Sequence, residues 1–434
     1  MTFRNFIEKI EKENKIIKIN KEVSTEFEIA NVLAALDGKV VMFNKVNNSK
    51  YPVIGNIVSS RELIADALGI KKEQLLEKLA WSIDNLKEPE IVEDAPCQEV
   101  EENSDLNTLP ILKYMPKDGG KYIASAVCII KDPETGIRNS CFHRLMLLDK
   151  NHFVARIVEN RGTDTALKKT GELDIAICIG NSVPVLLAAA TSLPDGVDEL
   201  GMANALEETM LVKCKTVDIE VPAESEFVLE GRILNKKVRE GPFLDLTETY
   251  DRIREQPVIE IKKITHRKNP IFHVLLPGKG EHKLLMGMPR EPTIFKEVNK
   301  VCKCKNVLIT PGGTSWLHAI VQIHKENADD GRKALEAAFK GHSSLKHCIV
   351  MDDDINIYDP DEVEWAIATR FQADKNALVL SNQHGSSLDP SAFQEPGKKA
   401  TTAKAGIDAT IPFGKTDKGF AKERYGKVDL KKYL

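Results

Sequence analysis

The sequence predicts a mixed α/β (α+β) protein in three parts, and the spacing of its apolar residues supports this. In residues 1–107, short strand-like runs alternate with helical patterns, which is typical of a small α/β unit. In residues 108–291, many short strand-like runs are separated by turns, as in a β-barrel or sandwich. Residues 292–434 return to alternating strands and helices, so we expect a second α/β domain there.

The first part begins with an amphipathic segment. Residues 3–15 place four apolar side chains on one helical face, namely Phe3, Phe6, Ile7 and Ile10. We expect further helices at 28–36, 61–67 and 72–86, and strands at 16–19, 40–43 and 53–57. An acidic, proline-containing stretch, 87–107, is predicted to be the linker that ends this domain.

The other two parts are predicted from the same patterns. Central strands are expected at 124–130, 145–148, 153–158, 174–179, 217–221, 227–233, 258–265 and 270–276. In the last part we expect helices at 294–301, 330–341 and 361–370, and strands at 307–310, 316–324, 347–351 and 377–381. The pair Asp359-Pro360 is a typical helix start. The lysine-rich tail after Pro412 is predicted to be a peripheral arm.

Composition excludes several classes of protein. The chain is 42% hydrophobic and 29% charged, with a net charge of −4, which is typical of a soluble globular protein and gives no basic footprint for nucleic acid. The longest apolar run, 183–190, is too short to span a membrane, and the start does not resemble a signal sequence. Eight scattered cysteines suggest reduced thiols, so we expect a cytoplasmic protein.

The chemistry is predicted to centre on residues 221–250. Alternation in 226–231 predicts a half-buried strand, and the turn Gly241-Pro242 follows it with carboxylates at both ends, Glu240 and Asp245. Two carboxylates that lie close together in a cleft can supply an acid and a base. Taken alone, the same pattern also fits a charged turn between two strands.

Several segments in order along the chain resemble the UbiD-type reversible decarboxylases, which use prenylated flavin mononucleotide (prenylated FMN). The resemblance covers residues 110–410 and rests on the following segments: Asp118-Gly-Gly-Lys-Tyr-Ile123, Asn139 with Arg144, Arg156 with Arg161-Gly162, Asp198-Glu-Leu200, Val221-Pro-Ala223, Glu240-Gly-Pro-Phe243, Val350-Met-Asp-Asp-Asp354 and Gly406-Ile-Asp-Ala-Thr410. It implies that the central domain is the split β-barrel that binds the flavin. It also implies that the last domain makes contacts in a homo-oligomer, a dimer or higher.

The resemblance also implies the roles of individual residues. Arg144, Glu240 and Asp245 would form the catalytic group, with Asp245 returning a proton to the carbon that loses CO₂. The cofactor would be bound by Phe142, His143, Arg144, Arg156, Ile157, Val158, Arg161 and Gly162. Asn139 and Glu199 would bind Mn²⁺ or Mg²⁺ at the flavin phosphate, since hard cations prefer oxygen ligands, and K⁺ could join them. A flavin prenyltransferase would supply the cofactor.

The substrate is predicted to be a small-molecule carboxylic acid. Leu244 and Glu248 stand where the family usually has glycine, and this altered turn resembles the archaeal branch that converts trans-anhydromevalonate 5-phosphate to isopentenyl phosphate in a modified mevalonate pathway. Lys279, His282, Lys283 and Arg290 are the candidate ligands of the substrate phosphate. Two alternatives stay open, namely an aromatic acid decarboxylase acting on 4-hydroxybenzoate or its polyprenylated relative, and a non-catalytic flavin-binding or assembly protein.

Overall fold

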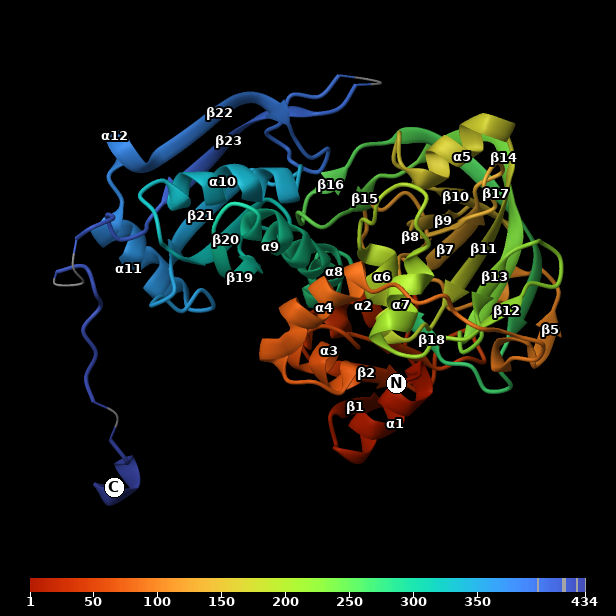
Figure 1. Ribbon diagram of the computed structural model, residues 1–434. Helices are drawn as coiled ribbons and strands as arrows, with labels where there is room; N and C mark the ends of the chain where they lie inside the picture. The colour runs from red at the N-terminus through yellow and green to blue at the C-terminus, as the bar shows by residue number, and fades with distance from the viewer. Residues whose placement is uncertain (396–397, 416–418, 427, 434) are drawn as a thin grey trace. The chain divides into compact units, whose positions relative to one another are not determined.

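A computed structural model gives the structure of the chain and describes residues 1–395, 398–415, 419–426 and 428–433 (Figure 1). The chain divides into two compact units. The first comprises Met1–Pro292, Pro311–Trp316 and Leu388–Pro390, and the second comprises Thr293–Thr310, Leu317–Ser387 and Ser391–Leu434. The mixed α/β class predicted from the sequence is confirmed, whereas the boundaries of the three domains stay a prediction. Part of the predicted lysine-rich arm lies outside the described residues.

The first unit begins with a four-stranded sheet of order β1-β2-β3-β18. Its strands are β1 (Ile16–Ile19), β2 (Val40–Phe43), β3 (Val53–Gly55) and β18 (Phe272–Val274), and the helices beside it in sequence are α1 (Phe3–Lys12), α2 (Glu28–Ala35), α3 (Arg61–Leu68) and α4 (Leu75–Asp84). Helix α1 starts after Thr2, whose hydroxyl accepts from the Asn5 amide at 3.2 Å. Its four predicted apolar residues are buried, so α1 packs onto the unit through the expected face.

A nine-stranded curled sheet forms most of the first unit. Its order is β6-β9-β10-β17-β14-β11-β7-β8, with β5 paired to β17. The strands are β5 (Val100–Glu102), β6 (Tyr122–Ile123), β7 (Val127–Lys131), β8 (Arg138–Phe142), β9 (Leu145–Leu147), β10 (His152–Ala155), β11 (Leu173–Ile179), β14 (Phe227–Glu240) and β17 (Arg254–His266). Both faces are covered, because Ala176 and Cys178 of β11 enter one core cluster while Ile175, Ile177 and Ile179 enter another.

The two longest strands of this sheet, β14 and β17, pair with each other. Residues Phe227–Gly231 of β14 are all buried, so the strand is covered on both faces rather than half-buried as predicted. Glu230 has no exposed surface and accepts hydrogen bonds from the amides of Lys215 and Thr216. Beyond Ile233 the strand passes an irregularity and continues to Glu240, which pairs in register with Arg254.

Helices also lie within the central region, where the sequence predicted strands and turns. They are α5 (Gly162–Thr170), α6 (Val183–Ala190), α7 (Glu199–Leu206) and α8 (Gly280–Gly287). Every residue of the apolar run that forms α6 is buried. Short additional strands are β4 (Ile91–Val92), β12 (Leu211–Lys213), β13 (Glu220–Pro222), β15 (Phe243–Leu244) and β16 (Tyr250–Asp251), and single 3₁₀ turns occur at Lys72–Gln74, Pro96–Gln98, Leu106–Thr108 and Met288–Arg290.

The second unit contains a five-stranded sheet of order β19-β20-β21-β23-β22. Its elements are α9 (Glu291–Asn299), β19 (Lys303–Ile309), β20 (His318–His324), α10 (Asp330–Gly341), β21 (His347–Asp352), α11 (Pro360–Arg370), α12 (Ala373–Asn376), β22 (Ala377–His384) and β23 (Thr401–Asp408), with a final 3₁₀ turn at Leu430–Lys432. The predicted helix start is observed, since the Asp359 carboxylate accepts from the Asp361 amide at 3.0 Å. Arg370 on α11 pairs with Asp352, the last residue of β21, at 3.2 Å and with Asp354 beyond the strand at 2.6 Å.

Two further observations bear on the compositional predictions. All eight cysteines are free, five of them in strands, which agrees with the expectation of reduced thiols. Among the helices that the structure describes, none combines the length and the apolar character that a bilayer-spanning segment needs.

Candidate active site

The predicted catalytic turn is a short excursion between two paired strands. Strand β14 ends at Glu240, the Gly241-Pro242 peptide bond is cis, and β15 then pairs with β16. Because Glu240 faces Arg254 across the β14–β17 ladder, the excursion returns close to where it left. Four charged side chains, Glu240, Asp245, Asp251 and Arg254, are thereby brought to one end of the long strand pair.

Arg144 lies in the middle of this group. It follows β8 and precedes β9, and its guanidinium donates from Nε and Nη2 to the two Glu240 oxygens, both at 2.9 Å. Its Nη1 donates to Oδ2 of Asp245 at 2.6 Å, and Nη2 also donates to Oδ2 of Asp251 at 2.9 Å. The guanidinium lies 4.9 Å from the centre of the Phe243 ring. The structure therefore brings together the three residues that the sequence proposed as catalytic, and we call them, with Asp251 and Arg254, the Arg144 group.

Burial makes these contacts strong. The Arg144 side chain is 8% exposed, and Glu240 has no exposed surface. Burial alone would lower the pKa of Arg144, but the hydrogen bonds and charge of Glu240, with the charges of Asp245 and Asp251, raise it above its usual value. Burial would likewise raise the pKa of Asp251, yet Arg144 and Arg254 hold it below its usual value. The guanidinium thus stays charged and Asp251 stays ionised.

The Arg144 group contains one more carboxylate than guanidinium. Glu240, Asp245 and Asp251 face Arg144 and Arg254, so the group can accept one proton without acquiring an excess positive charge. Glu240 is fully buried, while the Asp245 side chain is 15% exposed. Asp245 is therefore the member of the predicted pair that is open to a bound molecule.

The segment 118–123 holds the catalytic turn from the other side. The Gly119 amide donates to the Pro242 carbonyl at 2.8 Å, and a Cβ at position 119 would lie 2.3 Å from the Gly241 oxygen. Asp118 accepts from the Leu244 amide at 3.3 Å. The Tyr122 hydroxyl donates to Oε1 of Glu240 at 3.2 Å, and burial followed by the Glu240 charge raises the pKa of Tyr122. Only glycine fits the close backbone approach at position 119.

The predicted cofactor residues form two neighbouring segments. Phe142, His143 and Arg144 end and follow β8, and the Arg156 amide, just after β10, donates to the Arg144 carbonyl at 3.1 Å. Arg156 is buried and donates to the Ile157 carbonyl at 2.6 Å. His143 lies 3.0 Å from the Thr163 hydroxyl, and burial lowers its pKa to about 4, so its ring is neutral. Val158, Arg161 and Gly162 are exposed, beside these buried residues.

The predicted metal ligands are adjacent. Nδ2 of Asn139, on β8, donates to Oε1 of Glu199 at 3.1 Å, and the Ser140 amide donates to Oε2 at 2.8 Å. Glu199 is the first residue of α7. Burial raises the pKa of Glu199 to about 8, which is the response of a carboxyl group that lacks a compensating positive charge.

These residues fit a phosphate-linked divalent ion. An amide oxygen and a carboxylate are suitable donors for a hard cation, and the Ser140 hydroxyl beside them is buried with no hydrogen-bond partner among the described residues. A Cβ at Gly162 would lie 2.5 Å from Oδ1 of Asn139, so the start of α5 reaches this pair, and helix amino ends favour phosphate. The part of the chain that the structure describes contains no cluster of three acidic, histidine or cysteine residues able to hold a metal, so other oxygens would have to complete the shell.

Three members of the site carried no role in the sequence prediction. Tyr122 belongs to a segment that was noticed for its resemblance alone, and Asp251 and Arg254 follow the turn in an unremarkable charged run. The pairing of Leu244 with Tyr250 places Asp251 opposite Phe243, and the Glu240–Arg254 pair places Arg254. A sequence signal for both would have been the hairpin itself, which predicts that residues at equal distances from the turn face each other.

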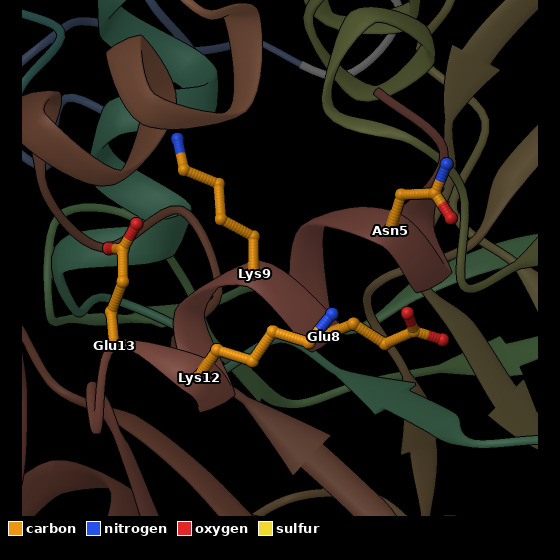
Figure 2. A pocket seen from close by; sticks show the side chains of 5 residues that line it. All are labelled: Asn5, Glu8, Lys9, Lys12 and Glu13. Atoms are coloured by element: carbon orange, nitrogen blue, oxygen red, sulfur yellow. The ribbon is translucent and has the colours of Figure 1, made fainter.

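A surface hollow elsewhere on the first unit has a different character. Figure 2 shows it along α1, lined by Asn5, Glu8, Lys9, Lys12 and Glu13. Lys9 donates to the Asp66 carbonyl at 3.0 Å, and no member of the Arg144 group lines the hollow. Its lining consists of polar side chains on a helix surface, and we assign no binding or catalytic role to it.

Three family models together match most of the chain. Residues 7–83 match the 3-octaprenyl-4-hydroxybenzoate carboxy-lyase N-terminal domain, 90–280 match the Rift-related domain of the same enzymes, UbiD, and 283–409 match their C-terminal domain.

Individual proteins give a finer comparison. The chain is 40% identical over 430 residues to an anhydromevalonate phosphate decarboxylase from Methanothermobacter thermautotrophicus, covering 96% of this chain and 98% of that protein. A protein of the same name from Methanocaldococcus jannaschii is 43% identical over 410 residues, covering 93% and 95%. The UbiD-class enzyme HmfF from Pelotomaculum thermopropionicum, solved with FMN, superimposes with a TM-score of 0.95 at 36% identity over both full chains. A 3,4-dihydroxybenzoic acid decarboxylase from Enterobacter cloacae gives 0.91 at 25% identity, covering 100% of this chain and 98% of that one.

Proposed function

The chain belongs to the UbiD family and is a decarboxylase, and we propose that it converts trans-anhydromevalonate 5-phosphate to isopentenyl phosphate and CO₂ with prenylated FMN as cofactor. The observation that carries the substrate assignment is the similarity, over more than nine-tenths of both chains, to archaeal proteins that bear this activity in their names. Decarboxylation in the modified mevalonate pathway follows from that assignment.

The Arg144 group supports the chemistry. Loss of CO₂ breaks the bond between the carboxyl carbon and C2 of the substrate, and a proton must then reach C2 to give the terminal alkene. Asp245 is the exposed carboxyl of the group and is the proposed donor of that proton. Arg144 holds Asp245 and the buried Glu240 in fixed positions through three hydrogen bonds, so little reorganisation is needed at the moment of transfer.

Prenylated FMN, when bound, would supply the sink for the electron pair released as the carbon–carbon bond breaks. Phe142, His143, Arg156, Ile157, Val158, Arg161 and Gly162 are proposed to hold it, with Asn139 and Glu199 holding Mn²⁺ or Mg²⁺ at its phosphate. The neutral His143 and the buried segment around it would keep water from the cofactor. Homo-oligomer formation, supply by a flavin prenyltransferase, a K⁺ ion and a cytoplasmic location belong to the same proposal. A structure of an evolved dimeric form of HmfF supports the first of these.

The substrate's phosphate needs fixed positive charge beside the site. Among the four candidates from the sequence, Lys279 and Lys283 both pair with Glu248, and His282 accepts from the Gly278 amide at 3.0 Å through Nδ1. Arg290 donates to the Ala190 carbonyl at 3.3 Å and lies 5.3 Å from the centre of the Trp316 ring. The first three therefore come from one segment, at the start of α8, that contacts the catalytic turn.

The test is a comparison of substrates on the holoenzyme. The protein is co-expressed with a flavin prenyltransferase, and its cofactor is identified by absorbance and mass. It is then given trans-anhydromevalonate 5-phosphate, 4-hydroxybenzoate and cinnamate, with CO₂ and isopentenyl phosphate as readouts. We expect turnover of the phosphorylated acid. Turnover of an aromatic acid, with none of the phosphorylated acid, would refute the assignment and favour an aromatic acid decarboxylase.

A further inference from the structure

An ion-paired cluster borders the catalytic turn, and the proposed mechanism does not use it. The turn 245–249 is closed by two backbone hydrogen bonds, from Asp245 to the Thr249 carbonyl at 3.0 Å and from Glu248 to the Asp245 carbonyl at 2.9 Å. Glu248 adopts a φ of 58°, in the left-handed region that side chains other than glycine, asparagine and aspartate seldom occupy. The turn is therefore held in a backbone conformation that is costly for glutamate, which makes the contacts of its side chain informative.

The carboxylate of Glu248 lies between two lysine ammonium groups. Oε2 is 3.2 Å from Nζ of Lys279, which caps the start of α8, and Oε1 accepts a hydrogen bond from Nζ of Lys283 in its first turn. The hydrogen bond from Lys283 and then that from Lys279 outweigh burial and lower the pKa of Glu248. One carboxylate thus bridges two cations, each held by a separate oxygen.

The Glu248 side chain is more exposed than the side chains of its two lysine partners. The side chains of Glu248 and Lys279 are 46% and 36% exposed, whereas that of Lys283 is 19% exposed. The two lysines flank Glu281 at the start of α8, and Glu281 is fully buried and accepts hydrogen bonds from the amides of Asn56 and Val58. The cations are consequently on the better-anchored side, and the carboxylate is on an exposed turn from which it can move away.

We propose that Lys279 and Lys283 form a binding site for a phosphate monoester, and that Glu248 occupies this site in the ligand-free enzyme and is displaced by the substrate's phosphate. A phosphate monoester carries up to two negative charges and three acceptor oxygens, so it satisfies two ammonium groups better than a carboxylate does. Glu248 is three residues from Asp245 in the same turn, so a phosphate bound here lies beside the proposed proton donor. The identity of the phosphorylated substrate rests on the proposed function, but the anion site does not.

The site predicts discrimination between substrates. An acid without a phosphate cannot displace Glu248, so the turn keeps its internal ion pairs. When the acid carries a phosphate, the phosphate oxygens replace the Glu248 carboxylate as the partners of Lys279 and Lys283. Glu248 is then a specificity-determining residue, because an anion binds to the two lysines only if it competes successfully with the Glu248 carboxylate.

The experiment measures inorganic phosphate binding to the holoenzyme by calorimetry at constant ionic strength. We compare wild type with Glu248→Gln, Lys279→Gln and Lys283→Gln, and with Lys262→Gln as a matched control, since Lys262 is an exposed lysine on β17 outside the cluster. Removal of the competing carboxylate should lower the phosphate Kd about two- to fivefold, the effect of one partly exposed ion pair. Each substitution in the lysine pair should raise the Kd by at least a similar factor, and the control should leave it unchanged.

An unchanged or weaker phosphate affinity in Glu248→Gln would overturn the proposal, as would lysine substitutions that leave the Kd at the wild-type value. Failure of the proposed function looks different. In that case the binding series behaves as expected, but the wild-type holoenzyme does not turn over trans-anhydromevalonate 5-phosphate. If that substrate is turned over but the phosphate Kd is the same in wild type and every variant, the anion site is rejected and the proposed function stands.

Discussion

Replacing Asp245 with asparagine separates binding from proton transfer at this site. Asparagine has nearly the same shape, but it cannot donate an acidic proton to carbon. Asp245 accepts from Nη1 of Arg144 at 2.6 Å and from its neighbour's amide, that of Leu246, also at 2.6 Å. The asparagine oxygen can keep one of these hydrogen bonds, and its amide group then faces the other donor.

The structure sets the size of the two effects. The lost hydrogen bond involves charged partners, so it costs about 1.5–3 kcal/mol at most, and Arg144 remains neutralised by Glu240 and Asp251. The variant should therefore fold, with the melting temperature lowered by a few degrees. The loss of a positioned general acid typically costs about 10²–10⁴-fold in rate. We expect kcat to fall by that factor while flavin content and KM stay near wild type.

The assay follows CO₂ release under saturating substrate, with Asp251→Asn as the matched control. That control removes the same formal charge from the same guanidinium, but Asp251 also pairs with Arg254 and is not the proposed donor. We expect its kcat to fall much less than that of Asp245→Asn. Equal losses in the two variants, or an Asp245→Asn enzyme within a few-fold of wild type, would refute the assignment of Asp245 as donor.

Three further predictions follow from other contacts. Asn139→Ala and Glu199→Ala should each lose flavin and metal together, measured by flavin absorbance and elemental analysis, with Glu220→Gln as the control that keeps both. Tyr122→Phe should lower kcat about tenfold and destabilise the fold by about 1–3 kcal/mol, because the buried Glu240 carboxylate loses a donor; kinetics and chemical denaturation measure the two effects. Burial lowers the pKa of Lys404 from 10.5 to about 8, so the folded state binds this proton less tightly than the unfolded state. The resulting penalty is present below pH 8 and disappears as the pH rises to 10.5, so Lys404→Met should raise the melting temperature below pH 8 and flatten its pH dependence above it.

Each of these has a contrary outcome. Retention of both metal and flavin in either alanine variant would remove the assignment of the bridging ion. An unchanged kcat in Tyr122→Phe would mean that the hydroxyl does not support Glu240 during turnover. A melting temperature of Lys404→Met below that of wild type at every pH would show that the Nζ hydrogen bond to the Ser343 carbonyl outweighs the desolvation of the lysine.

Most of the fold was predictable where apolar periodicity is undisturbed. The strands 16–19 and 40–43 and the helix 330–341 have the predicted bounds, because each has a clean apolar pattern between polar ends. Strand β14 was predicted to end at Ile233, yet it continues to Glu240, since main-chain pairing with β17 shifts register after Ile233 and resumes from Lys237 to Glu240. The predicted strand 316–324 begins only at His318, because the two residues before it belong to a turn. Helix α6 was missed because it is buried all round and has no polar face to show a helical period.

The site was predictable only in part. Sequence resemblance proposed Arg144, Glu240 and Asp245, and the structure shows why such distant residues converge: β8 leads to Arg144, and β14 ends at Glu240. Asp251 is recognisable only through the hairpin pairing that places it opposite Phe243. No local pattern marks Tyr122, because its hydrogen bond to Glu240 joins residues far apart in the chain. The same holds for Glu248, whose two cation partners are about thirty residues further along the sequence.

The hairpin that carries the Arg144 group has a consequence for how such enzymes diversify. Glu240, Asp245, Asp251 and Arg254 lie within one short stretch of chain, and the register of β14 with β17 fixes both ends of it. Residues 247–249 at its tip are partly or fully exposed and pair with neither long strand. Side-chain replacements at the tip that keep the two backbone hydrogen bonds closing the turn can therefore be inherited without moving the proton-handling carboxylates. New substrate preferences can arise there through a few substitutions. Exchanging the tip sequences between relatives is a direct way to transfer a substrate preference.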